Sequence, residues 1–156
     1  MTMLLDREGL LTALRTLDEE LDASGIRGEV FIVGGAAMAL AYDARRATVD
    51  VDGIFVPAAE VRMAAARVAE RLDLEGDWLD DSAKAFMPGP DPDRIGVFDS
   101  DNLSVAAASP RYLLAMNFSP PGSSATKTTF AFFTSSVFLR RSQKGPIWSS
   151  RRIRVT

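Results

Sequence analysis

The chain has 156 residues, of which 47% are hydrophobic, with 18 basic and 21 acidic side chains but no histidine or cysteine. This composition fits one globular domain and excludes thiol nucleophiles, disulfides, Cys/His zinc sites and imidazole bases. The longest apolar runs fall far short of the roughly 20 residues that cross a bilayer. Acidic residues also stand near the start, where a secretory signal is basic. The sequence therefore predicts a cytoplasmic protein with no membrane partner.

Charge divides the chain into two unlike parts. Residues 1–116 hold all 21 acidic residues and 11 of the 18 basic ones. Residues 117–156 hold the other seven basic residues, no acidic residue and 13 serines or threonines. Their apolar residues follow no sustained helical or strand period. We expect a folded core over 1–116 and a basic, Ser/Thr-rich tail over 117–156 that is disordered, binds nucleic acid or is translated out of frame.

Hydrophobic patterning predicts the elements of the core. Helices are predicted where apolar residues recur at three- and four-residue steps, and strands where β-branched and aromatic residues form short runs. Ser109 and Pro110 are typical of the N-cap and first residue of a helix. The predicted helices cover 6–24, 36–42, 58–72, 77–87 and a segment from 109 to 116, and the predicted strands cover 29–33, 49–56 and 103–107.

Gly34 and Gly35 stand between a predicted strand and a predicted helix. Such a pair is typical of a turn that needs positive φ or a close backbone approach. It is also typical of a phosphate site, because backbone N–H groups without a neighbouring Cβ can meet a triphosphate at the positive end of a helix. Taken alone, the glycine pair leaves both interpretations open.

Asp50 and Asp52 alternate with valines in V-D-V-D-G-I-F-V, which predicts that both carboxylates share one face of a strand. Alone, this pattern also fits an exposed polar face. The strand is so apolar, however, that two carboxylates on one face would repel at a cost that a divalent cation offsets. Mg²⁺ is normally held by one or two carboxylates together with substrate phosphates. A chain without histidine or cysteine can carry out phosphoryl and nucleotidyl transfer, which depend mainly on positioning and charge stabilisation.

Residues 31–55, F-I-V-G-G-A-A-M-A-L-A-Y-D-A-R-R-A-T-V-D-V-D-G-I-F, resemble the minimal bacterial nucleotidyltransferases of the DNA polymerase β-like superfamily, which include abortive-infection toxins. The resemblance implies an α+β palm fold with a mixed β-sheet flanked by α-helices. It implies that Gly34 and Gly35 contact a nucleoside triphosphate and that Asp50 and Asp52 bind a catalytic Mg²⁺. Arg46 and Thr48 match the Arg-X-Thr that often precedes the carboxylates, and they either contact phosphate or acceptor or only shape the turn into the strand.

The resemblance implies a Mg²⁺-dependent nucleotidyltransferase that moves a nucleoside monophosphate to a hydroxyl on RNA or protein. It also implies an antitoxin partner. A third carboxylate, if the site has one, would come from Asp99 or Asp101. The alternatives are a catalytically inactive relative, a nucleic-acid-binding module that uses the basic tail, and a plain α/β domain in which the two motifs are coincidental.

The resemblance continues over 105–116, V-A-A-A-S-P-R-Y-L-L-A-M, and stops where the composition changes. In the family a lysine and later an acidic stretch follow, whereas this chain has Asn117-Phe118-Ser119-Pro120. For one choice of synonymous codons, a single-base shift within codon 117 restores K-L-L-A and an acidic stretch. We therefore hypothesise that residues 117–156 are translated out of frame, which sequencing the DNA through codons 110 to 156 tests.

Overall fold

A computed structural model of the chain describes residues 3–43 and 45–117. Apart from Asn117, the tail predicted over 117–156 lies outside these residues. None of the helices they form has both the length and the apolar character that a membrane crossing requires. In chain order the elements are α1 (Arg7–Ala23), β1 (Gly28–Ile32), α2 (Gly34–Ala41), β2 (Val51–Val56), α3 (Ala58–Leu72), β3 (Leu79–Asp80), the 3₁₀ helix η1 (Ser82–Phe86), β4 (Ile95–Asp99), β5 (Leu103–Ala107) and α4 (Pro110–Met116).

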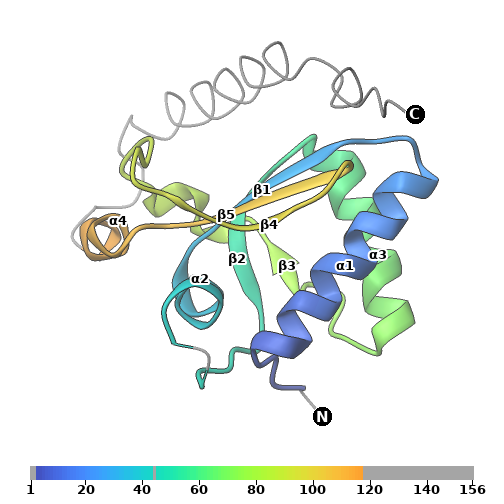
Figure 1. Cartoon of the computed structure of the whole chain (residues 1–156), viewed down its shortest axis with the longest axis horizontal. Coiled ribbons are helices and arrows are strands. Elements are labelled where there is room, and N and C mark those ends of the chain that lie inside the picture. The colour runs from blue at the N-terminus through green and yellow to red at the C-terminus, as the bar shows by residue number, and fades with distance from the viewer. Residues whose placement is uncertain (1–2, 44, 118–156) are drawn as a thin grey trace, which may run out of the picture.

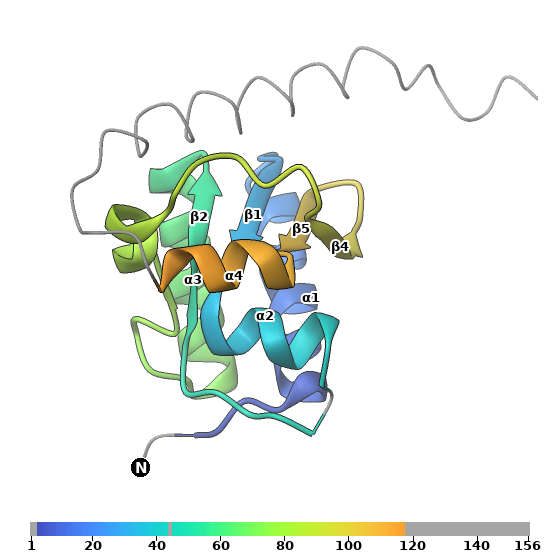
Figure 2. The ribbon, with the colours of Figure 1, turned by 90° about the vertical axis from the view of Figure 1, so that its left-hand side faces the viewer.

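The five strands form one sheet in the order β3-β2-β1-β5-β4. β1 pairs with β2 in antiparallel and with β5 in parallel orientation, while β3 runs parallel to β2 and β4 antiparallel to β5. The sheet is therefore mixed. Helices flank it on both faces, with α1 and α3 on one side and α4 on the other (Figures 1 and 2). This confirms the expected α+β class with a mixed sheet flanked by helices.

The larger core lies between the sheet and the helices α1 and α3. The leucine stripe predicted for α1 is buried there, and Asp6 caps the helix by accepting a hydrogen bond from the Gly9 N–H. Arg67 of α3 donates to Glu20 of α1 at 2.6 Å, and Arg71 donates to the same carboxylate at 2.9 Å. The apolar stripes therefore hold α1 and α3 on the sheet, and ion pairs join the two helices to each other at the protein surface.

A second, smaller cluster covers the opposite face. Side chains alternate along β1, so Val30 and Ile32 enter the larger core whereas Phe31 points to the other face. There the Phe31 ring meets the Tyr112 ring of α4 edge-on at 5.3 Å. The members of this cluster are Phe31, Val33, Ile54, Met87, Ala108 and Tyr112. The face of the sheet that α4 crosses is called the α4 face below.

Most predicted elements are confirmed, and the exceptions lie around the sheet edges. The helix predicted over 77–87 is wrong, because this segment holds the two-residue strand β3 and the 3₁₀ helix η1. The edge strand β4 was not predicted. The strand predicted over 49–56 begins only at Val51, so Asp50 precedes it. Ser109 caps α4 as predicted, accepting a hydrogen bond from the Tyr112 N–H, and Pro110 is its first residue.

Candidate functional site

The two glycines form the first turn of α2 directly after β1. Gly34 has φ of +65°, the left-handed conformation that favours glycine, and the helix continues from it to Ala41. Val33 occupies the N-cap position, where it offers no side-chain hydrogen bond to the helix. The first N–H groups of a helix have no partner within the helix, so an uncapped N-terminus of this kind is suited to an anion.

Asp52 lies beside this turn. The Val33 N–H donates to the Asp52 carbonyl at 2.8 Å, which ties the end of β1 to the start of β2. A Cβ placed on Gly34 would lie 3.4 Å from Oδ2 of Asp52. The Asp52 carboxylate therefore stands against the backbone of Gly34, on the same face of β2 as Ile54 and thus on the α4 face.

Asp50 stands just before β2, in the segment that leads from α2 into the strand. Its position is linked to Thr48, whose hydroxyl lies 3.0 Å from the Asp50 carbonyl oxygen and 3.4 Å from Oδ1. Thr48 also approaches the glycine turn, since a Cβ on Gly35 would lie 3.1 Å from the Thr48 Oγ1. The structure therefore brings Gly34, Gly35, Thr48, Asp50 and Asp52 together at one end of the sheet.

The electrostatics of this end are dominated by carboxylates. Burial raises the pKa of Asp52, and the neighbouring carboxylates of Asp50 and Asp80 raise it further. Each of these causes disfavours the charged form of Asp52 in the folded chain. A cation bound beside Asp52 would lower the pKa of Asp52, because a neighbouring opposite charge favours the ionised carboxylate.

Asp80 is the residue that sequence reasoning missed. It lies on β3, where it is the register partner of Asp52 on the adjacent parallel strand, so both side chains lie on the α4 face. Hydrogen bonds from the hydroxyl and the backbone N–H of Ser82 lower the pKa of Asp80, and Arg62 acts in the same direction. The sequence held a weak signal for it, because Trp78 and Leu79 form an apolar pair directly before the aspartate.

Asp99 and Asp101 lie at the other end of the sheet. Asp99 ends β4 and makes a 4.0 Å ion pair with Arg27, which also donates to the Asp101 carbonyl. This region borders Gly28, the first residue of β1, whereas Asp52 borders Val33, which follows the last residue of β1. The length of β1 separates the two aspartates from the glycine turn, so neither can supply a third carboxylate there.

Arg46 lies in the connection between α2 and β2, two residues before Thr48. Its side chain is exposed, and its backbone N–H donates to the Asp43 carbonyl at 3.0 Å. The neighbouring Arg45 is paired with Asp43. Arg46 is thus a cation on the surface of the segment that carries Thr48 and Asp50 to the glycine turn.

The carboxylates of Asp50 and Asp52 are chemically suited to Mg²⁺, because this hard cation prefers oxygen ligands. Burial, and after it the charges of Asp50 and Asp80, raise the pKa of Asp52, and a bound cation would offset the cost of ionising it there. Across residues 3–43 and 45–117, no three acidic side chains come together as a complete metal site. The fit is therefore to a cation held by one or two carboxylates and completed by phosphate oxygens.

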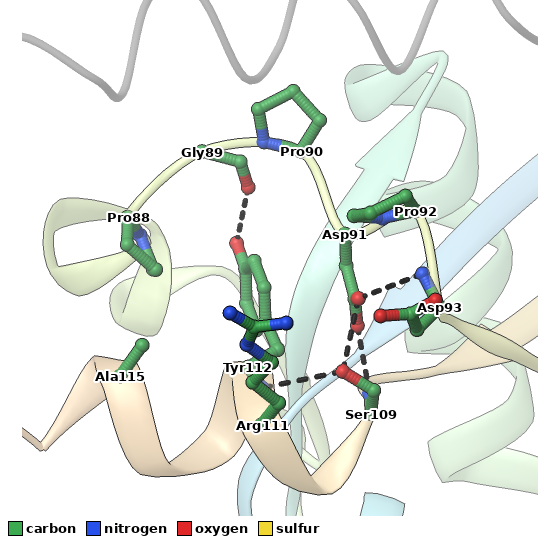
Figure 3. A pocket seen from close by; sticks show the side chains of 10 residues that line it. All are labelled: Pro88, Gly89, Pro90, Asp91, Pro92, Asp93, Ser109, Arg111, Tyr112 and Ala115. Carbon is green, nitrogen blue, oxygen red and sulfur yellow. Dashed lines mark hydrogen bonds between the residues drawn. The ribbon is translucent and has the colours of Figure 1, made fainter.

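A separate cavity of about 260 Å³ lies between α4 and the loop of residues 88–93 (Figure 3). Asp91, a residue of this loop, is buried, and its carboxylate accepts hydrogen bonds from the N–H of Ser109 at 2.7 Å and from the Ser109 hydroxyl at 2.9 Å. Tyr112 reaches from α4 to the loop and donates to the Gly89 carbonyl at 2.7 Å. Burial raises the pKa of Tyr112. None of the predicted site residues lines this cavity, and the hydrogen bonds of Asp91 and Tyr112 fix the loop on the helix.

The sequence and structure were compared with known proteins in three ways. A scan against protein-family models, a search of curated proteins and a search of solved structures each found no significant match to this chain.

Proposed function

We propose that this chain is a Mg²⁺-dependent nucleotidyltransferase with a palm-type fold, which transfers a nucleoside monophosphate from a nucleoside triphosphate to an acceptor hydroxyl. One observation carries the proposal. Gly34, in left-handed conformation at the uncapped N-terminus of α2, lies beside the carboxylate of Asp52. A phosphate-binding turn in contact with a metal-binding carboxylate is the arrangement that this reaction requires.

In this proposal the N–H groups of Gly34 and Gly35 bind the triphosphate, and Asp50 and Asp52 hold the cation. Asp80, the register partner of Asp52 on β3, adds negative charge next to it. When bound, Mg²⁺ neutralises phosphate charge and polarises the reacting phosphoryl group. The acceptor hydroxyl loses its proton to solvent as its oxygen bonds to the α-phosphorus, and the bond from the α-phosphorus to pyrophosphate breaks. The exposed Arg46 is the cation closest in sequence to Thr48 that could meet phosphate oxygens.

The acceptor class follows from the resemblance of residues 31–55 and not from the site geometry. That resemblance favours a hydroxyl on RNA or on a protein, and a role as the toxin of a pair with an antitoxin partner. The acceptor would approach from the solvent side of Asp50 and Asp52, since the buried side of β2 is filled by Val51 and Phe55.

The test is transfer of label from α-labelled nucleoside triphosphates, with Mg²⁺ present, to RNA and to protein in a lysate of the source cell. We expect incorporation that requires Mg²⁺ and falls by about 100-fold in Asp52→Asn and in Asp50→Asn, because each loses charge that holds the cation. The matched control is Asp99→Asn, which removes a carboxylate at the opposite end of the sheet and should retain activity.

Two results would count against the proposal. Equal activity in Asp52→Asn and the wild type would show that the Asp52 carboxylate takes no part in the transfer reaction. No Mg²⁺-dependent triphosphate binding, together with salt-sensitive nucleic-acid binding that is lost on deleting residues 117–156, would favour the nucleic-acid-binding module instead.

A further inference from the structure

Thr48 is held in place by the main chain of the N-terminal segment. The Leu5 N–H donates to the Thr48 carbonyl at 2.6 Å, and the Thr48 N–H donates to the Leu5 carbonyl at 2.9 Å. This isolated antiparallel bridge is anchored by the Leu5 side chain, which is only 2% exposed and belongs to the larger core. The backbone of Thr48 is therefore held by two hydrogen bonds to a buried residue of the N-terminal segment.

The side chain of Thr48 lies between Asp50 and the first turn of α2. A hydroxyl has one proton, and here it is directed to the Asp50 carbonyl at 3.0 Å with the carboxylate Oδ1 within reach at 3.4 Å. On its other side, Oγ1 and Cβ of Thr48 would lie 3.1 and 3.4 Å from a Cβ on Gly35. Thr48 thus fills the space that the absent side chain of Gly35 leaves.

Asp50 has little other support for its orientation. It precedes β2, so the strand pairing that fixes Asp52 does not extend to it. The Thr48 hydroxyl donates to the Asp50 carbonyl and lies 3.4 Å from Oδ1, so the carboxylate shares its proton and turns less freely relative to its own backbone. A group that orients a metal-binding carboxylate in this way raises metal affinity without touching the metal.

We propose that Thr48 is a positioning residue that orients the Asp50 carboxylate for cation binding beside Asp52. This inference rests on the proposed function, because it assumes that Asp50 and Asp52 hold the cation. Thr48 would then support the metal-binding carboxylate and would not contact phosphate or acceptor. The main chain of Leu5, which holds Thr48, would support the site indirectly.

Two substitutions separate the hydroxyl from the shape of the side chain. Thr48→Val keeps the volume that packs against Gly35 but removes the donor, whereas Thr48→Ser keeps the donor and loses a methyl group. A metal-positioning role predicts that the serine variant retains cation affinity and the valine variant loses it. A purely structural role predicts that affinity follows the thermal stability of the metal-free chain.

The experiment measures Mn²⁺ binding to the full chain by electron paramagnetic resonance of the free ion, without nucleotide, so that no activity is needed. We expect Thr48→Val to weaken Mn²⁺ affinity about tenfold, the lower range for loss of a group that supports a ligand. Thr48→Ser should stay within about twofold of the wild type on the same grounds. In an Asp50→Asn background, Thr48→Val should cause no further loss, because the two changes remove the same interaction.

A second variant covers the case in which Thr48→Val does not fold. Gly35→Ala places a methyl group against the Thr48 hydroxyl and should weaken Mn²⁺ binding by displacing it. Wild-type affinity in a folded Thr48→Val or Gly35→Ala chain overturns the inference, as does a loss that persists in the Asp50→Asn background. If the wild type binds Mn²⁺ no better than Asp52→Asn, the metal site itself is overturned and the role of Thr48 falls with it.

Discussion

Asp52 on β2 and Asp80 on β3 are direct register partners, with both carboxylates on the α4 face of the sheet. The pairing is parallel and involves only two residues of each strand. Burial and the charges of Asp50 and Asp80 raise the pKa of Asp52, so the ionised form is disfavoured in the folded chain. This relationship has a measurable consequence for stability in the absence of metal.

We predict that Asp52→Asn stabilises the metal-free chain at neutral pH. A folded-state pKa above the unfolded value of about 3.8 means that the contribution of Asp52 to stability is fully present below that pH and is lost as pH rises through the raised pKa. Asparagine does not titrate, so the advantage of the variant should be absent near pH 3 and grow toward neutrality. Denaturant unfolding at a series of pH values measures it.

Addition of Mg²⁺ should reverse that order. At 100 times its Kd, a ligand of the folded state adds about 2.7 kcal/mol to the free energy of unfolding. The wild type should gain this stability and Asp52→Asn should not, while Asp99→Asn should behave as the wild type. A Tm that is independent of Mg²⁺ in all three proteins would contradict the metal site.

Gly34→Ala should disrupt the candidate phosphate turn. A residue with a Cβ pays about 1–2 kcal/mol in the left-handed conformation, and the new methyl group would contact the Asp52 carboxylate. Gly25→Ala is the matched control, because Gly25 has φ of +64° with no atom within 4 Å of the added Cβ. Both variants should lose similar stability, measured by thermal unfolding.

Nucleotide binding should then separate the two glycine variants. Only Gly34→Ala should weaken Mg²⁺-dependent triphosphate binding, measured by titration calorimetry at a temperature where both chains are folded. If Gly34→Ala and Gly25→Ala bind the triphosphate equally well, the turn at Gly34 does not hold phosphate.

Asp91→Asn should release the loop of residues 88–93 from α4. The buried carboxylate accepts from two groups of Ser109 and from the Asp93 N–H at 3.1 Å, and an amide nitrogen in its place would face donors. We expect a loss of about 1–3 kcal/mol in the free energy of unfolding. Faster proteolysis at the loop should accompany it, and Asp93→Asn, at an exposed position, should change neither property.

Glu20→Gln should weaken the contact between α1 and α3. Hydrogen bonds from Arg67 and then from Arg71 lower the pKa of Glu20, so its contribution is present above about pH 4.5 and is lost as pH falls toward the lowered folded-state value. The expected loss at neutral pH is up to about 1 kcal/mol, and it should shrink with added salt. Glu19→Gln breaks only the more exposed pair with Arg71 and should cost less in the same denaturant experiment.

The sequence predicted those parts of the fold whose signal is local. The leucine period predicted α1, the alanine-rich run predicted α3 with its stated bounds, and Ser109-Pro110 predicted the start of α4. β3 could not be predicted in this way, because two residues form a strand only by pairing with Val51 and Asp52. β4 is an edge strand with half-exposed side chains and a glycine, so it lacks the alternation that marks a strand.

The same difference explains the candidate site. Gly34, Gly35, Asp50 and Asp52 come from one continuous stretch, so motif spacing was enough to suggest that they lie together. Asp80 comes from a strand that exists only in the folded sheet, and it lies close to Asp52 only because β3 pairs with β2. The alternation rule placed Asp50 on the strand with Asp52, whereas in the structure it precedes the strand and depends on Thr48.

The bridge between Leu5 and Thr48 ties the assembly of the site to the folding of the first half of the chain. The two residues lie at the ends of a segment that contains α1, β1 and α2, so they meet only when those elements are in place. Contacts between distant residues form after the entropy of loop closure has been overcome. On refolding, we expect cation binding to return no earlier than burial of the leucine face of α1, so that an incompletely folded chain carries no competent site.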